Sequence, residues 1–320
     1  MSLREKHLAA EHAVFEKDMS FTTSDGTHIA YSVVNADDVG IPVVFMNGWT
    51  CPDAYWKVIG PGIVDAGHPA VFFDARGHAQ SGLPRAPGLF GQKLKKEDLT
   101  VERLARDVIE LLEAAGIEKA VLMGHSMGVQ GLFEAYRVAP ERVAGLIPVA
   151  GTYENPVPTF ANQAFLDKLF PIADVLFRRV PFVLLRPVLA QGSRFPSLGV
   201  RAVRFLHVAN HNVTAEDIAP HAAQFSELNM SVLWRITSEM RAHSAAEVLP
   251  TVQVPVLILA GRKDLFTPQT VQERMHELLP DSELVWFEEG GHLLPVEEAS
   301  GIVSTVNEFL ARRIDVKATA

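Results

Sequence analysis

The pentapeptide Gly-His-Ser-Met-Gly at residues 124–128 constrains the fold of this chain most strongly. It follows directly after the apolar run at residues 120–123, which is typical of a buried strand. Gly128 and Gly131 beyond it favour a helix that packs closely on a sheet. The pattern therefore predicts a strand, a sharp turn and a helix, with Ser126 at the turn, which is the arrangement of a nucleophile elbow.

A serine is a poor nucleophile unless a base and an orienting acid accompany it. Asp264 follows the apolar run at residues 254–260, and His292 follows the run at 284–287. Because parallel strands end at the same edge of a sheet, we expect Ser126, Asp264 and His292 to meet there as nucleophile, acid and base. Glu154, after an apolar run at 143–149, is the alternative acid.

Two further motifs lie in the N-terminal half. Residues 74–81 are similar to the D-x-R-G-x-G-x-S turn of the α/β-hydrolase family, with Ala79 in place of a glycine. Residues 45–49 resemble the strand and His-Gly loop of that family, with Asn47 in place of the histidine. Together with the elbow and the order Ser, Asp, His, these motifs make the chain resemble an α/β-hydrolase of the esterase and lipase kind. The resemblance covers residues 20–150 and 250–312 approximately.

The resemblance implies an α/β fold with a mostly parallel central sheet flanked by helices, and an inserted helical cap. In the predicted division, residues 1–18 form an N-terminal helical arm, 19–151 and 249–320 form the core, and 152–248 form the cap. The cap segment has no strand-like run but several helical patches separated by prolines. The sequence leaves three interpretations open for the apolar stretch at residues 175–187. The stretch lines a cleft, packs on the core or contacts a lipid surface.

The same resemblance implies a site and an activity. The backbone N–H groups of Trp49 and Met127 would form the oxyanion hole, and Asn47, Gly48 and Leu265 would line the substrate pocket. The predicted activity is hydrolysis of carboxylic esters with apolar acyl groups, through an acyl-enzyme on Ser126. An acyltransferase, a perhydrolase, a C–C bond hydrolase or a receptor without activity remain alternatives. An epoxide hydrolase is disfavoured, because the related enzymes carry aspartate at the position of Ser126.

Composition limits the partners and the compartment. The net charge of −9 disfavours nucleic acid, whose binding relies on clustered cations. Cys51 is the single cysteine, so no internal disulfide is expected, and the charged N-terminus lacks a signal peptide. These features predict a cytoplasmic protein without stable membrane insertion, and they leave a homo-oligomer open. No cofactor is implied, and His207 and His211, although spaced four residues apart, lack the other features of a metal site.

Overall fold

The computed structural model describes most of the chain. The described residues are 5, 9, 12–14, 16–49, 51, 53–84, 95, 97–158, 201, 213–217, 219 and 230–315.

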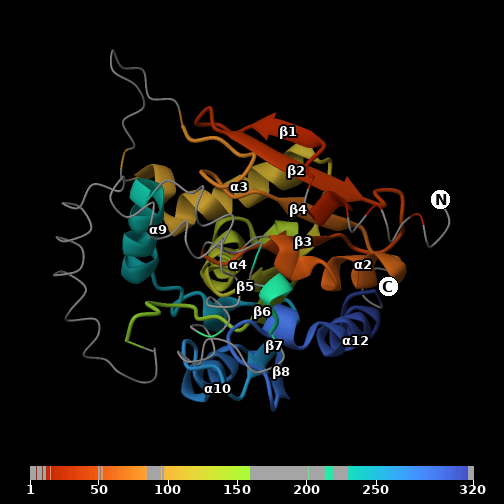
Figure 1. Cartoon of the computed structure of the whole chain (residues 1–320), viewed down its shortest axis with the longest axis vertical. Coiled ribbons are helices and arrows are strands. Elements are labelled where there is room, and N and C mark those ends of the chain that lie inside the picture. Colours follow the sequence, from red (N-terminus) through yellow and green to blue (C-terminus); the bar gives the residue numbers. More distant parts are fainter. Residues whose placement is uncertain are drawn as a thin grey trace.

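Eight strands form one sheet in the order β1-β2-β4-β3-β5-β6-β7-β8 (Figure 1). They are β1 (Met19–Thr22), β2 (His28–Val34), β3 (Val43–Met46), β4 (Ala70–Phe73), β5 (Ala120–His125), β6 (Val143–Val149), β7 (Val256–Gly261) and β8 (Ser282–Phe287). In this sheet order, β4, β3, β5, β6, β7 and β8 pair in parallel with their neighbours. In contrast, β2 is antiparallel to both β1 and β4. The prediction of a mostly parallel sheet is confirmed.

The strands β1 and β2 form an antiparallel hairpin. Gly26 lies in the turn at a φ of 84°, a left-handed conformation that glycine adopts without steric cost. The apolar strands β3 and β4 are buried along their whole length, as expected for strands covered on both faces.

Helices cover both faces of the sheet. Buried side chains of α3 (Val101–Ala114), α4 (Met127–Val138) and α10 (Gln269–Leu278) share one apolar core with the sheet. Those of α2 (Ile59–Asp65) and α12 (Ala299–Phe309) share a second core on the other face, where the two helices lie side by side (Figure 1). Thr100 caps α3 by accepting a hydrogen bond from the Arg103 N–H.

Of the predicted cap, the structure describes the beginning, a few residues near 215 and the C-terminal part. That part contains α9 (Met230–Ala242), which packs against η2 (Glu97–Leu99) and the start of α4. Residues 175–187, His207 and His211 lie outside the described residues, and the division into arm, core and cap stays a prediction. Within the described part of the chain, no helix is long and apolar enough to cross a membrane.

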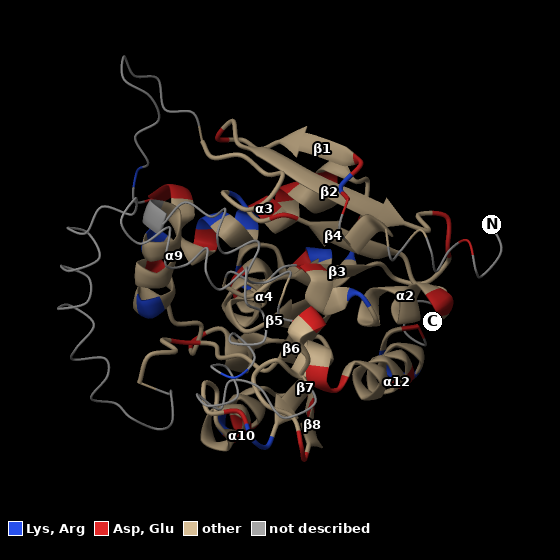
Figure 2. Ribbon diagram, viewed as in Figure 1, with Lys and Arg blue, Asp and Glu red and all other residues tan. Residues whose placement is uncertain are grey.

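Charged side chains avoid most of the sheet. The strands β1 to β7 contain no Lys, Arg, Asp or Glu, whereas α3 carries both acidic and basic residues (Figure 2). Arg76, which is fully buried, donates two hydrogen bonds of 2.6 Å to Asp107 of α3 and one of 2.7 Å to Asp25 in the β1–β2 turn. Arg103 contacts Asp107 at 2.8 Å from the other side. We call these four residues the Arg76 network; it ties the turn after β4 to α3 and to the hairpin.

Candidate active site

Ser126 lies between β5 and α4 in a strained backbone conformation, with φ 53° and ψ −112°. Such a conformation is costly for a residue with a Cβ, and it persists only where the surroundings impose it. Two glycines make the turn fit. A Cβ on Gly124 would lie 2.5 Å from the Gly128 carbonyl oxygen, and one on Gly128 would lie 2.4 Å from the Met46 oxygen. Only glycine allows β5, α4 and the end of β3 to approach this closely.

The structure brings Ser126, His292 and Asp264 into one hydrogen-bonded chain. Ser126 Oγ lies 3.0 Å from His292 Nε2, and His292 Nδ1 lies 3.0 Å from Asp264 Oδ2. His292 and Asp264 are buried, with exposed fractions of 9% and 3%, whereas Ser126 is half-buried. Ser126 is thus the most exposed of the three hydrogen-bonded residues.

Asp264 follows β7 and is held as a carboxylate by its own turn. Its two oxygens accept hydrogen bonds from the N–H groups of Phe266 and Thr267 at 2.7 and 3.0 Å, and from the Thr267 hydroxyl at 2.6 Å. Burial alone would raise the pKa of Asp264, but His292 and the Thr267 bonds outweigh it and lower the pKa below its usual value. The group therefore stays charged at neutral pH.

His292 follows β8 and is fixed on several sides. The Phe266 ring stacks on its imidazole with centroids 4.8 Å apart. His125 Nε2 lies 2.8 Å from the His292 carbonyl oxygen, which fixes the backbone. The loops after β7 and β8 are joined by a 2.9 Å bond from the Lys263 N–H to the Gly290 oxygen. These contacts leave the imidazole little freedom to turn away from Ser126.

The loop after β3 lies against the nucleophile. A Cβ on Gly48 would lie 3.0 Å from the Ser126 Cβ and 2.9 Å from the Cys51 sulfur. Trp49 is 37% exposed, and its indole N–H points to the Leu233 oxygen of α9 at 3.5 Å. The predicted donors, Trp49 and Met127, thus belong to two segments that meet at Ser126. The role of their N–H groups stays a prediction.

The remaining predicted residues lie around this centre. Asn47 is half-buried and bonded through both atoms of its amide, to Asp53 and Trp56. Leu265 is half-buried directly after Asp264. Glu154, the alternative acid, lies in the loop after β6, whereas His292 Nδ1 contacts Asp264. Within the described residues, no cluster of side chains could hold a metal ion.

Cys51 lies beside this loop and is buried. Burial raises the pKa of its thiol to about 12, so the reactive thiolate is not populated at neutral pH. Cys51 is therefore a poor competitor for the predicted nucleophile, Ser126, whose role stays a prediction.

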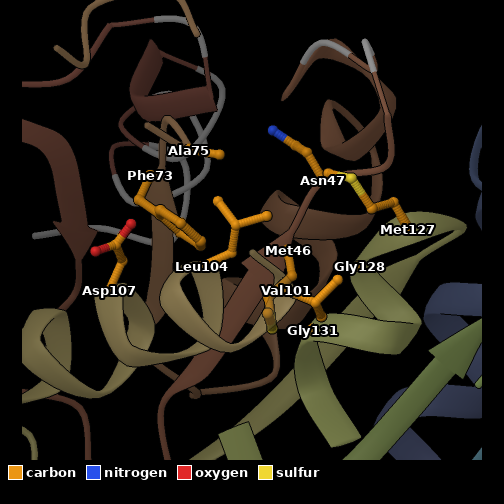
Figure 3. Close-up of a pocket in the computed structure, with 10 residues that line it drawn as sticks. All are labelled: Met46, Asn47, Phe73, Ala75, Val101, Leu104, Asp107, Met127, Gly128 and Gly131. Atoms are coloured by element: carbon orange, nitrogen blue, oxygen red, sulfur yellow. The ribbon is translucent and has the colours of Figure 1, made fainter. Parts of the chain in front are cut away.

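A cavity of about 30 Å³ lies beside the elbow, enough for a water molecule or a small group. Figure 3 shows Asn47 and Met127 on one side of it and Phe73 and Asp107 on the other. Most of the lining is apolar and comes from the ends of β3 and β4 and the beginnings of α3 and α4. Small apolar groups thus fit close to the elbow.

Sequence reasoning missed the residues that support the chain. Phe266 and His125 hold His292, and the side chain of Glu297 accepts a hydrogen bond from the Gly291 N–H. Thr267 was missed as well, although it is the one with a local signal, because it stands in the turn three residues after Asp264. The other contacts join distant segments and leave no local pattern.

Comparison with known proteins agrees with this fold. A family model described as alpha/beta hydrolase fold matches residues 41–299. The chain is 26% identical over 275 residues to a protein of Variovorax paradoxus named "Putative carbamate hydrolase RutD", covering 85% of this chain and 92% of that one. It is 24% identical over 318 residues to epoxide hydrolase A of Mycobacterium tuberculosis, covering 89% and 95%.

Among solved structures, a thermophilic esterase from Thermogutta terrifontis superposes with a TM-score of 0.68. The sequence identity is 20%, and the match covers 92% of this chain and 98% of the esterase. At that identity the likeness concerns the fold.

Proposed function

The chain belongs to the alpha/beta hydrolase fold family, and from this premise we propose that it is a serine hydrolase that cleaves carboxylic esters through an acyl-enzyme on Ser126. The observation that carries the proposal is the hydrogen-bonded chain from Asp264 through His292 to Ser126, whose last member stands on a strained turn. Its relatives include hydrolases of several bond types, so the ester is the part to be tested.

In the proposed reaction, His292 Nε2 takes the proton of the Ser126 hydroxyl as the oxygen attacks the ester carbonyl. The imidazole is already 3.0 Å from that oxygen. Asp264, charged and bonded to Nδ1, keeps the tautomer in which Nε2 is free to accept the proton, and it stabilises the imidazolium that forms. The same imidazolium then gives its proton to the leaving alcohol.

The tetrahedral intermediate carries a negative oxygen that needs hydrogen-bond donors. The Met127 N–H is in the first turn of α4, where helix N–H groups have no partner within the helix. The Trp49 N–H belongs to the loop that lies against Ser126. We assign both groups to the oxyanion hole. A water molecule activated by His292 then releases the acid and restores Ser126.

The apolar side chains around the elbow support an apolar acyl group. Met46, Phe73 and Met127 line the neighbouring cavity. The indole of Trp49 adds an exposed apolar surface next to the loop. A carbamate has the same carbonyl geometry, and one relative is named for carbamate hydrolysis, so carbamates form the second substrate class to test.

The test is turnover of p-nitrophenyl esters of graded acyl length, with matched aryl carbamates, by the wild type and by Ser126→Ala. We expect ester turnover that Ser126→Ala lowers by about 10⁴-fold or more. A fluorophosphonate should label Ser126 in the wild type alone. A folded wild type that hydrolyses no ester, or a Ser126→Ala variant that retains the activity, would contradict the proposal.

A further inference from the structure

Lys17, at the end of the predicted N-terminal arm, is a buried cation with three oxygen atoms close to its Nζ. Its side chain is 1% exposed, and its Nζ contacts Asp53 Oδ2 at 2.5 Å. The same nitrogen donates to the backbone oxygens of Ala13 and Val14 at 3.2 and 2.9 Å. The ammonium group thus has two hydrogen bonds and one ion pair, all within the fold. A buried charge is retained only with such partners, which makes this point of the fold rigid.

Asp53 connects Lys17 to the loop after β3. Its other oxygen, Oδ1, accepts a hydrogen bond from the Asn47 Nδ2 group. The Asn47 Oδ1 atom in turn accepts one of 2.6 Å from the Trp56 indole N–H. Asp53 and Trp56 both belong to η1 (Asp53–Trp56), a short helix whose four residues are buried. Both ends of the Asn47 amide are thus tied to buried groups.

The held side chain lies at the start of the segment that contacts the nucleophile. Gly48, the next residue, packs against Ser126, and the Trp49 N–H follows one peptide later. Rotation of the Asn47 backbone would therefore move that N–H relative to Ser126 Oγ. Oxyanion donors act at 2.7–3.1 Å from the developing charge, so about 1 Å of displacement is costly for the rate.

We propose that Lys17 is a positioning residue: its buried ion pair with Asp53 holds the Asn47 amide, and Asn47 fixes the loop whose N–H binds the oxygen of the tetrahedral intermediate. This inference rests on the proposed function. It connects Lys17, which lies outside the catalytic residues, to the position of an oxyanion donor.

A positioning role has a kinetic signature that a purely structural role lacks. Loss of the anchor leaves ground-state binding of the ester intact, because the oxyanion exists only in the transition state. Lys17→Met should therefore lower kcat by about tenfold to a hundredfold with little change in KM, less than the loss expected for removal of a donor. Affinity for a trifluoromethyl ketone, whose adduct carries the same negative oxygen, should fall by a similar factor.

The experiment compares Lys17→Met with Arg103→Met, which removes a largely buried cation from the Arg76 network, away from the loop. Lys17→Met leaves Asp53 buried without its cation, so the double variant Lys17→Met/Asp53→Asn is made as well. It removes both charges of the ion pair, keeps an acceptor for Asn47 and still lacks the anchor. All variants are measured at a temperature where circular dichroism shows them folded.

A second readout does not depend on turnover. The Trp56 indole N–H donates to Asn47, and with four tryptophans in the chain its ¹H–¹⁵N resonance is readily assigned. It should shift and exchange faster in both Lys17 variants but not in Arg103→Met. If the wild type hydrolyses no ester, the proposed function fails, and this resonance alone decides whether Lys17 holds the loop.

The inference is overturned if the folded double variant keeps the wild-type kcat and ketone affinity. It is also overturned if the Trp56 resonance is unchanged in the Lys17 variants, or if Arg103→Met shows the same losses as they do. A fall in kcat at constant KM, together with the shifted resonance, supports it.

Discussion

Two buried networks of polar side chains lie near the elbow, and they differ in what they can do. The chain from Asp264 to Ser126 contains one carboxylate, one imidazole and one hydroxyl. The Arg76 network contains two guanidinium groups and two carboxylates at 2.6–2.8 Å. Arginine does not lose its proton in proteins, so the two cations of the second network are permanent, whereas the imidazole of the first can take up and release a proton.

The backbone makes the same distinction. Ser126 is held at a positive φ that costs free energy, while Arg76 joins a turn, a helix and a hairpin. Burial and charge are common to both networks. We therefore expect the first network, with its imidazole and strained support, to be the reactive one, and the second, whose arginines bridge separate elements, to be structural.

The strongest test of this distinction is Asp264→Asn. The amide can keep the bonds from the turn but no longer stabilises the imidazolium or selects its tautomer, so kcat should fall by about 10⁴-fold. Stability should change far less than activity. Glu154→Gln, in the loop after β6, is the matched control and should keep kcat. A collapse of activity in the control instead would move the acid to Glu154.

Arg76→Met reverses the expected pattern. It leaves the buried carboxylate of Asp107 with one cation, and it removes the cation that contacts the exposed Asp25. The free energy of unfolding should fall by about 3–5 kcal/mol, because one buried charge loses a partner. The kcat of the folded fraction should stay near that of the wild type. Urea unfolding and ester kinetics on the same sample separate the two effects. Arg312→Met, which breaks an exposed pair with Glu283, should cost less than about 1 kcal/mol.

Gly48→Ala tests how tightly the loop packs on the nucleophile. A Cβ there would lie at 3.0 Å from the Ser126 Cβ, so either the loop or the serine must shift. We expect about a hundredfold loss of kcat, the lower end of what loss of an oxyanion donor costs. The control is Gly82→Ala beside the Arg76 network, where the new Cβ would meet its nearest atoms at 3.6 Å. Equal losses in both variants would mean that the loop at Gly48 has no special role.

Much of the fold could be predicted from the sequence because its signals are local. Apolar runs ended by glycine mark β3, β5 and β7 within two residues of their observed bounds. Parallel strands end at one edge, so the residues after them, Ser126, Asp264 and His292, could be expected together before any contact was known.

The contacts that hold these residues in place were beyond the sequence. Lys17 and Asp53, or His125 and the His292 oxygen, join segments far apart in the chain. No periodicity or turn signal encodes such a pair, because each partner is compatible with many others until the backbone has folded. Asn47 illustrates this: the sequence shows the substitution for histidine, and the structure shows the amide bonded on both sides.

Asp74 carries the smallest predicted effect, and it is the exception among the charges of the turn after β4. It is 6% exposed, and its carboxylate accepts a hydrogen bond of 3.0 Å from the Gln80 N–H. Burial, followed by the negative charge of Asp53, raises its pKa to about 6, although Lys17 opposes the shift. A carboxyl whose pKa is raised on folding favours the native state when protonated. Its contribution is complete below pH 4 or so, the range of an unfolded aspartate, and is lost as the pH rises through about 6.

Asp74→Asn removes this titration and keeps an oxygen that can accept the Gln80 bond. The variant should therefore be more stable than the wild type at pH 8, by about 1–3 kcal/mol, and nearly equal to it at pH 4. Thermal unfolding across this pH range measures the difference. A stabilisation that does not depend on pH would show that the charge of Asp74 is compensated in the fold. Asp74 would then resemble the carboxylates of the Arg76 network, whose charges are balanced by arginine.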